Sequence, residues 1–200
     1  SKGGYGWGAV GTSGRYCFNG GTSMATPLVA GGAALMRQYA SARASITNPS
    51  AALVRAMIVG GARTLTPGQY GTATYREIPE TSPNNVEGWG EVDLTGSVHP
   101  SGQMIKLVDG IALANGATNE YAVTVTVSGQ DLQATLAWVD YPSALNAAKN
   151  LVNDYDLQLV GSDGNIVFAN SKTAPDTVNN TEKILVPAAT EGTYTFRVIA

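Results

Sequence analysis

Two patterns of apolar residues divide this chain. Apolar side chains in residues 1–100 recur at helical spacing between glycine-rich stretches, whereas residues 101–200 alternate between apolar and polar positions. A repeat near 3.6 residues predicts helices, and a repeat of two predicts half-buried strands. The change of period therefore predicts an α+β chain with two domains, residues 1–100 and residues 101–200.

The first half predicts a long apolar helix. Residues 23–39 contain no Asp, Glu or Lys and consist largely of Ala, Gly, Leu, Val and Met. This composition favours a helix that is buried on nearly every side. Gly31 and Gly32 would each cost about 1 kcal/mol relative to Ala, so we expect a neighbour to pack too closely there for a Cβ atom.

A second helix is predicted in the sequence NPSAALVRAMIVGG, residues 48–61. Asn48 is the expected N-cap and Pro49 the first helical residue. The expected buried face is formed by Leu53, Ala56 and Met57, and the helix is expected to stop at Gly60 and Gly61. Residues 63–85 are rich in Thr, Pro, Gly and Asn and predict an irregular surface segment.

The second half predicts six short strands. In EYAVTVTV, residues 120–127, Tyr121 and three valines fall on one face and threonines on the other. Similar patterns follow in LQATLAWV, YDLQLVG, NIVFAN, EKILVP and TYTFRVIA, with SDGN as a hairpin turn between the third and fourth. Short strands without intervening helices predict an antiparallel β-sandwich or jelly roll.

The two ends of the sequence suggest a piece of a longer protein. The last predicted strand runs to Ala200, so we expect an unpaired sheet edge there and an artificial C-terminus. The first residue is Ser1, so we also expect the natural N-terminus to be missing.

Composition excludes some partners. Hydrophobic residues make up 44% and charged residues 14% of the chain, which is sufficient for a packed core. The net charge of −3 and the lack of a Lys/Arg run argue against nucleic acid as a partner. No apolar run reaches the ~20 residues of a membrane span. Cys17 is the only cysteine, so no intrachain disulfide can form, and we interpret it as a small buried hydrophobe.

Ser23 is the principal candidate for chemistry. It lies at the expected start of the first helix, where free backbone N–H groups and the positive end of the helix dipole could hold an oxyanion. Gly20 and Gly21 allow a tight turn before it, and Pro27 is expected within the first helical turn. Local features alone favour the alternative that Ser23 or Thr22 is a helix cap, because Ser and Thr are common at helix starts.

The segment GTSMATPLVAG, residues 21–31, closely resembles the nucleophile segment of the subtilisin-like serine proteases, the subtilases. The resemblance implies a serine endopeptidase that acts on protein or peptide substrates. It also implies that Ser23 forms the acyl-enzyme and that its own N–H is one oxyanion donor.

The chain lacks the other members of the subtilase triad. The family's order is Asp, then His, then Ser, yet none of the 22 residues before Ser23 is His or Asp. His99, the sole histidine, does not match the family's histidine and is interpreted as a solvated loop residue. The resemblance thus implies that the N-terminal part of the catalytic domain is a missing partner. We expect the isolated chain to be inactive, and to form a dimer or swapped assembly or to retain that fragment.

The resemblance extends into the second half. GWGEVDL, residues 88–94, looks like the segment that closes a subtilase catalytic domain. LAWVDYP, LVNDYDLQLV and GTYTFRV resemble pieces of the C-terminal jelly-roll domain of bacterial alkaline subtilases, related in shape to the P-domain of proprotein convertases. This implies a secreted, extracellular protein, and calcium is common in such domains.

Four acidic residues are candidate calcium ligands: Asp140, Asp154, Asp156 and Glu182, with Asn153 and Asn180 as further oxygen donors. In an extended segment Asp154 and Asp156 point to one face, which favours either a cation or an Arg/Lys partner. The alternative is that both aspartates are ordinary turn residues.

Two other functions remain open. Residues 21–25 could form a nucleophile elbow of the α/β-hydrolase type with Asp93 and His99, but the α/β pattern that this fold needs downstream is absent. The chain could also be a non-catalytic β-sandwich module for binding or stabilising a partner. An aromatic platform on the β face would favour this function, but Trp138 alone does not form one.

Overall fold

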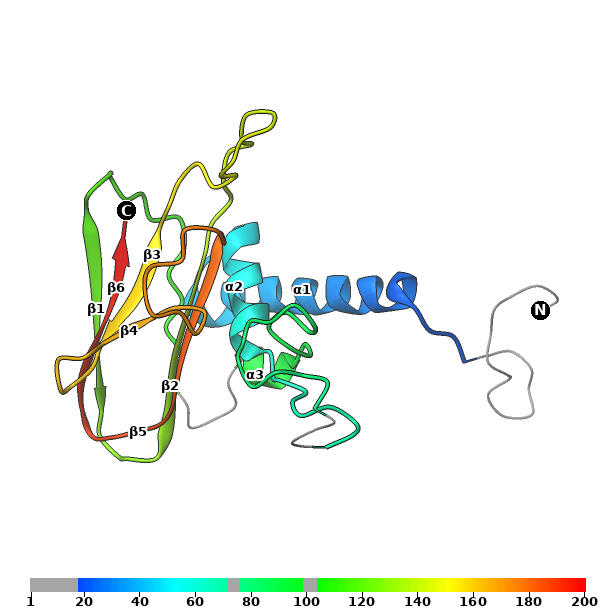
Figure 1. Ribbon diagram of the computed structural model, residues 1–200, viewed down its shortest axis with the longest axis horizontal. Helices are drawn as coiled ribbons and strands as arrows, with labels where there is room; N and C mark the ends of the chain where they lie inside the picture. The colour runs from blue at the N-terminus through cyan, green and yellow to red at the C-terminus, as the bar shows by residue number, and fades with distance from the viewer. Residues whose placement is uncertain (1–17, 72–75, 99–103) are drawn as a thin grey trace.

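The computed structural model describes residues 18–71, 76–98 and 104–200 of the chain. Helices come first and strands follow (Figure 1). The helices are α1 (Thr22–Ala44), α2 (Ala51–Gly61) and α3 (Leu94–Val98). The strands are β1 (Thr118–Val125), β2 (Gln130–Ala137), β3 (Asp156–Val160), β4 (Ile166–Phe168), β5 (Thr181–Ala189) and β6 (Gly192–Ile199). All six predicted strands are therefore present.

Two antiparallel sheets share one core. One sheet has the strand order β1-β6-β3-β4, and the other pairs β2 with β5. Their inner faces meet in a single apolar cluster, formed by Leu132, Leu157, Leu159, Ala169, Ile184, Ala189, Tyr194 and Phe196. This arrangement of helices and antiparallel sheets confirms the α+β class. The more specific jelly-roll description stays a prediction.

The predicted unpaired edge at the end of the chain is wrong. β6 is an inner strand of the larger sheet, because β1 pairs with it on one side and β3 on the other. The predicted hairpin between β3 and β4 is confirmed. The N–H of Gly161 donates to the carbonyl of Asn165, and Gly164 has a φ of 82°, which a residue without a Cβ adopts readily.

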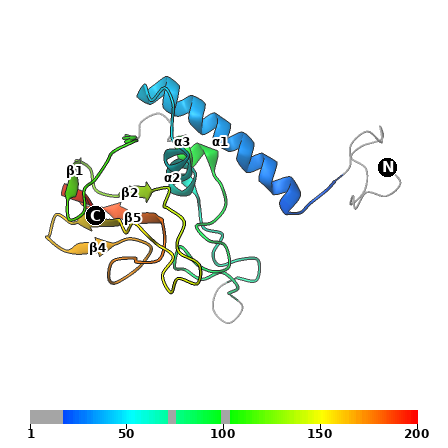
Figure 2. The same ribbon diagram turned by 90° about the horizontal axis from the view of Figure 1, so that it is seen from above.

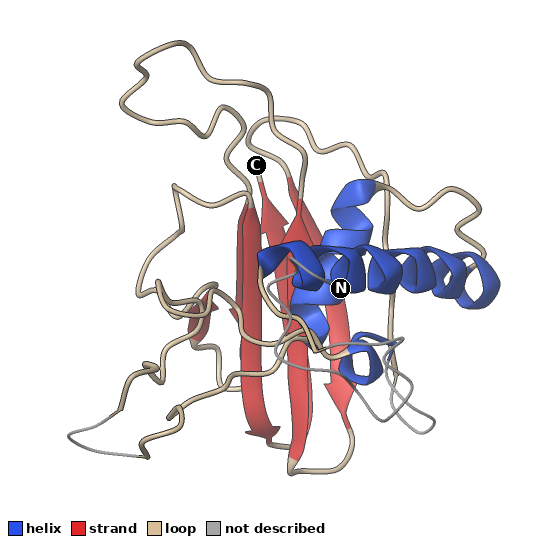
Figure 3. Ribbon diagram, turned by 90° about the vertical axis from the view of Figure 1, so that its right-hand side faces the viewer, coloured by secondary structure: helices blue, strands red, loops and turns tan. Residues whose placement is uncertain are grey.

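The helices have a second, smaller core on one side of the sheets (Figure 3). Met36 and Ala40 from α1 pack against Leu53, Val54 and Met57 from α2, and Leu107 packs against this cluster from the segment before β1. We refer below to residues 18–98 as the helical unit and to residues 104–200 as the β unit. Leu107 belongs to the β unit by position but to the helical core by packing, and the domain boundary near residue 100 stays a prediction.

The first helix is longer and much less buried than predicted. α1 runs away from the rest of the molecule along most of its length (Figure 2). Its buried residues are Gly32, Met36 and Ala40, whereas Leu28 is 77% exposed and Leu35 is 52% exposed. The expectation of burial on nearly every side is wrong for this structure, because the described chain packs only against the C-terminal half of α1.

The two adjacent glycines of α1 differ. A Cβ on Gly32 would lie 2.8 Å from the side chain of Leu94 in α3, which confirms a close approach at this position. A Cβ on Gly31 would meet nothing within 4 Å. The close-packing prediction therefore holds at Gly32 and is wrong at Gly31.

The N-cap of α2 is Ser50 rather than Asn48. The hydroxyl of Ser50 accepts a hydrogen bond from the N–H of Leu53 at 3.0 Å, and Asp109 accepts from both the N–H and the hydroxyl of Ser50. Asn48 instead accepts from the Arg37 guanidinium at 3.1 Å. The helix begins two residues later than predicted because a serine that is itself held by a carboxylate caps it.

Candidate active site at Ser23

Ser23 is the second residue of α1 and is solvent-exposed. The N-cap is Gly21, whose φ of 130° is strained for any residue with a Cβ. No side chain caps the helix. The alternative in which Ser23 or Thr22 caps α1 is therefore wrong, and the Ser23 hydroxyl is free of that task.

The start of α1 presents uncapped backbone donors. The N–H groups of Met24 and Ala25 donate to the carbonyl of Gly21 at 3.0 and 3.1 Å. The N–H groups of Thr22 and Ser23 precede the first helical hydrogen bonds and have no acceptor within the helix. Together with the helix dipole they form a local environment that favours negative charge beside the Ser23 hydroxyl.

The prediction that Pro27 lies in the first turn of α1 is wrong, because Pro27 is inside the helix. It is the sixth residue of α1. In a regular helix its N–H would donate to the carbonyl of Ser23, but proline has none. The turn that carries Ser23 consequently has a weaker backbone ladder than the rest of α1.

Asp93, the acid of the α/β-hydrolase alternative, has a local structural role. Asp93 caps α3, because its Oδ1 accepts from the N–H groups of Thr95 and Gly96 at 2.9 and 3.1 Å. This contact explains Asp93 without a catalytic role. His99 and Cys17 lie outside the described residues.

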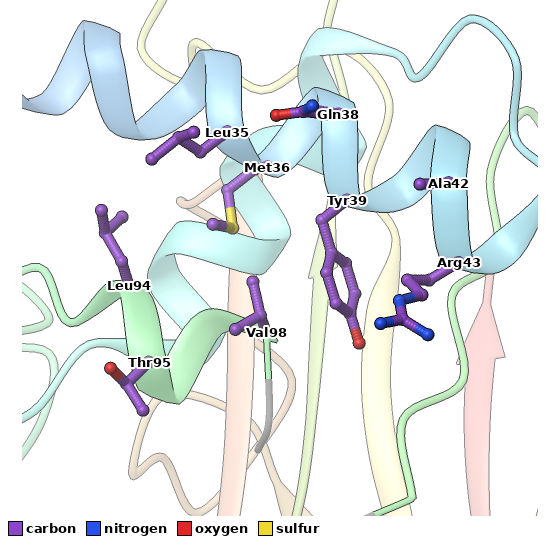
Figure 4. A pocket seen from close by; sticks show the side chains of 9 residues that line it. All are labelled: Leu35, Met36, Gln38, Tyr39, Ala42, Arg43, Leu94, Thr95 and Val98. Atoms are coloured by element: carbon purple, nitrogen blue, oxygen red, sulfur yellow. The ribbon is translucent and has the colours of Figure 1, made fainter. Parts of the chain in front are cut away.

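A shallow apolar groove of about 460 Å³ lies between α1 and α3 (Figure 4). Leu35, Met36 and Tyr39 line one side, and Leu94 and Val98 line the other. Ser23 lies 12 residues before Leu35, which is roughly 18 Å along a helix axis. The groove is therefore not a substrate pocket for Ser23.

The predicted calcium ligand Asp140 braces a loop. Its Oδ1 accepts from the N–H groups of Tyr141 and Asn153 and from the Asn153 side chain, and its Oδ2 accepts from the N–H of Val152. Desolvation opposes ionisation, but these hydrogen bonds outweigh it and lower the pKa of Asp140. Both oxygens are already occupied by donors.

The other predicted ligands carry unpaired oxygens. Asp154 Oδ1, Asp156 Oδ1 and Glu182 Oε1 are buried without a hydrogen-bond partner. Glu182 is 1% exposed, and its Oε2 accepts from the N–H of Leu157 at 2.6 Å. Burial, with the charges of Asp156, Asp176 and Asp154 added, raises the pKa of Glu182 to about 8. Lys149 forms an ion pair with Asp154 Oδ2 at 2.8 Å, so the predicted Arg/Lys partner is present at one of the two aspartates.

Asp176 is a buried acidic residue that the sequence prediction missed. Its carboxylate accepts from Asn170 Nδ2, from Asn179 Nδ2 and from the N–H of Val178. Burial opposes these donors, but they lower the pKa of Asp176, so its negative charge remains beside Glu182. The signal was the sequence PDTVNNTE, in which an aspartate and two asparagines precede Glu182.

These side chains do not close around a common point. Among the described residues, no three or more His, Cys, Asp or Glu side chains are arranged as a metal centre. The searched residues also include no helix that is long and apolar enough to cross a membrane.

Comparison with known proteins identifies the helical part of the chain. Residues 8–90 match the model of the subtilase family. This range contains Ser23, α1 and α2. We refer to these matched residues, which are less than half of the chain, as the subtilase segment.

Two relatives from Dictyostelium discoideum are similar over most of the chain. The serine protease/ABC transporter B family protein tagB is 26% identical over 89% of this chain, and the similarly named protein tagD is 25% identical over 90% of it. The chain spans only 12% and 13% of their lengths. These matches extend beyond residues 8–90, and together with the family model they support a relationship to the subtilisin-like serine proteases.

Proposed function

We propose that the protein is a serine endopeptidase that hydrolyses peptide bonds through an acyl-enzyme on Ser23. The observation that carries the proposal is an exposed serine, uncapped and beside free N–H groups, within the subtilase segment. The Ser23 hydroxyl would attack the substrate carbonyl, and the N–H of Ser23 would stabilise the oxyanion.

The general base and its orienting acid must come from elsewhere, because no His or Asp precedes Ser23 in this chain. We propose that a further part of the catalytic domain supplies both and covers the exposed face of α1. The 77% exposure of Leu28 supports this, because a large apolar side chain in the middle of a helix normally packs against something. The isolated chain would then be inactive.

A fluorophosphonate tests this proposal, because it reacts only with an activated serine. We expect the longer protein that contains this chain to be labelled at Ser23, as located by peptide mapping, and the isolated chain to remain unlabelled. Ser23→Ala abolishes the labelling, whereas Ser41→Ala, at another exposed serine of α1, does not. Absence of labelling in the longer protein would favour the non-catalytic alternative.

The alternative function is a β-sandwich module that binds or stabilises a partner. Its candidate binding residue, Trp138, is buried. Trp138 is only 8% exposed, and its ring packs edge-on against Tyr155 at 5.3 Å between ring centroids. Its indole N–H donates to the carbonyl of Asn153. Trp138 is therefore part of the core and offers no open aromatic platform.

We also propose that a calcium ion binds among Asp154, Asp156 and Glu182. Their unpaired buried oxygens are of the type that Ca²⁺ prefers, and a cation would relieve the repulsion among them. The carboxylates would have to draw closer together, since they form no metal centre as they stand. Asp140 does not fit as a ligand while its oxygens accept from backbone donors.

Titration of the metal-free chain with Ca²⁺ in a calorimeter tests the ion site. We expect binding that Glu182→Gln weakens and that Asp163→Asn, at an exposed carboxylate of the β3–β4 hairpin, leaves unchanged. Equal affinity of all three proteins, or no heat of binding, would rule the site out.

Secretion is the remaining proposal, and it rests on the resemblance to extracellular subtilases. Fractionation of the source cells with an antibody against the β unit would test it, with the protein expected in the medium.

A further inference from the structure

The C-terminal end of α2 is capped by a single backbone N–H, which Ala62 donates to the carbonyl of Val59 at 3.3 Å. The helix ends in Gly60 and Gly61 and has no basic residue in its last turn. Carbonyls in the last turn of a helix have no intrahelical donor and carry the negative end of the helix dipole. The end of α2 therefore needs a donor from elsewhere.

Lys183 of β5 supplies that donor. Its ammonium donates to the carbonyls of Val59, Gly60 and Ala62 at 3.0, 2.9 and 3.2 Å. An ammonium has three protons, so the three carbonyls can use all of them. Lys183 is partly buried and forms none of the ion pairs in the described part of the chain.

The alternation of β5 directs this side chain towards α2. Lys183 lies opposite Thr135 of β2 in the register of the small sheet, so the two share one face. A Cβ on Gly60 would lie 3.2 Å from the Thr135 hydroxyl, so α2 approaches the sheet closely at this point. The preceding residue, Glu182, points to the opposite face and accepts a hydrogen bond from the N–H of Leu157.

Arg55 makes the reverse connection from α2 to the β unit. Its Nη2 donates to the carbonyls of Trp138 and Asn180, which follow β2 and precede β5. Asn180 in turn donates from Nδ2 to the carbonyl of Trp138 at 3.2 Å. Each unit thus sends one cation into the backbone carbonyls of the other.

We propose that Lys183 and Arg55 are a reciprocal pair of positioning residues that couple the β unit to α2, with the Lys183 ammonium acting as a tethered cation at the end of the helix. The last turn of α2 is then ordered only while β5 is docked. Because α2 packs against α1 through Met57 and Met36, the β unit holds the helix that carries Ser23. Only this last step rests on the proposed function.

Hydrogen–deuterium exchange tests the coupling without any activity measurement. In Lys183→Met, which keeps most of the apolar stem and removes the charge, we expect peptides covering residues 57–62 to exchange at least tenfold faster. Peptides from β6 should be unchanged. Lys172→Met, at an exposed loop lysine, is the matched control and should leave α2 unchanged.

Chemical rescue separates a cation from a mere space-filling side chain. In Lys183→Ala the lost atoms leave room beside the three carbonyls, so added ethylammonium should restore slow exchange of residues 57–62. The same concentration of ethanol should not, because it carries no charge. Lys183→Met should not respond to ethylammonium, because its side chain fills the space. The experiments are run at pH 7, below the pKa of about 8 to which burial lowers Lys183.

Unchanged exchange of α2 in Lys183→Met would overturn the proposal, as would equal rescue of Lys183→Ala by ethanol and by ethylammonium. If the Lys183 variants do not fold, the same exchange measurement on Arg55→Met tests the coupling instead. Faster exchange of residues 57–62 together with residues 138–140 and 180–182 supports the coupling, and unchanged exchange of all three overturns it.

The effect on Ser23 is measured separately in the longer protein. We expect Lys183→Met to slow fluorophosphonate labelling at Ser23 severalfold and Lys183→Arg to restore part of the rate. Faster exchange of α2 without a change in labelling would confine the coupling to α2. If even the unaltered protein is not labelled, the proposed function fails while the exchange result stands.

Discussion

Strand β3 of the β unit and helix α1 of the helical unit differ in how completely each buries its apolar side chains. In the β unit, Leu159 is 1% exposed, and both sheets contribute to the core around it. In the helical unit, Leu28 is 77% exposed on the same helix that buries Met36 at 2%. Strands with alternating apolar residues bury their apolar faces when two sheets pack against each other. A long apolar helix is buried only if other elements pack along its whole length.

This difference shows where the chain depends on other contacts. The C-terminal half of α1 is held by α2 and α3, and α2 is held by Lys183 and Arg55 at the sheet. The N-terminal half of α1, with Ser23, extends from this base (Figure 2). The candidate nucleophile therefore lies in a part of the described chain that has little packing around it.

The largest expected effect tests the buried carboxylate of the β unit. The pKa of Glu182 is about 8 against an ordinary 4.5, so the fold favours the protonated form. The contribution of Glu182 to the free energy of unfolding is fully present below pH 4.5 and is lost as the pH rises to 8. The loss is up to about 5 kcal/mol, because each unit of pKa difference corresponds to about 1.4 kcal/mol. Urea denaturation of the metal-free chain between pH 5 and 8 measures the loss.

Glu182→Gln should remove this pH dependence, since glutamine does not ionise. Saturating Ca²⁺ should also reduce it if the proposed ion site exists, because a cation favours the ionised carboxylate. A wild-type stability that stays constant from pH 5 to 8 would contradict the burial of an unpaired acid.

The second largest effect is expected when a leucine side chain is truncated in each of the two units. Leu159→Ala should destabilise the chain by about 2–5 kcal/mol, because it opens a cavity in a closed core. Leu28→Ala should change the stability of this chain by less than about 0.5 kcal/mol, because its side chain is exposed. Urea denaturation of both variants gives the comparison, and equal losses would mean that α1 is covered.

The smallest effects come from glycines within the helices. Gly61→Ala should destabilise the chain by roughly 1–3 kcal/mol, because a Cβ there would overlap the backbone of Ser97 in α3. Gly31→Ala should stabilise it by about 0.5–1 kcal/mol, because the site is open and alanine favours a helix. Thermal unfolding checks both signs, and a loss of stability in Gly31→Ala would indicate an unseen neighbour.

Local pattern was sufficient to predict the strands and the presence of both long helices. The two-residue alternation around Tyr121 and Val123 matches β1, where those side chains are half-buried and their neighbours exposed. Helix boundaries were less predictable. The cap of α2 is Ser50 because Asp109, which is distant in sequence, holds its hydroxyl.

The candidate site was predictable only in part. Ser23 could be found from its surrounding segment, because the spacing of small residues there is specific to one family. The hydrogen bonds of Asp140 could not be predicted, because only the folded loop brings the N–H groups of Val152 and Asn153 to its oxygens. Asp176 was missed because an aspartate before two asparagines reads as an ordinary turn.

The sequence by itself determined the type of the six strands and of the two longer helices, the candidate nucleophile and the change from helices to strands near residue 100. These depend on side-chain periodicity and on residues that are neighbours in the chain. Only the tertiary structure decided which strand became the inner one, which half of α1 is buried, and that Lys183 and Arg55 connect the two units. Those outcomes depend on contacts between residues that are distant in sequence, and no local pattern contains them. The contacts of Lys183 with Val59 and of Arg55 with Trp138 join residues more than 80 positions apart.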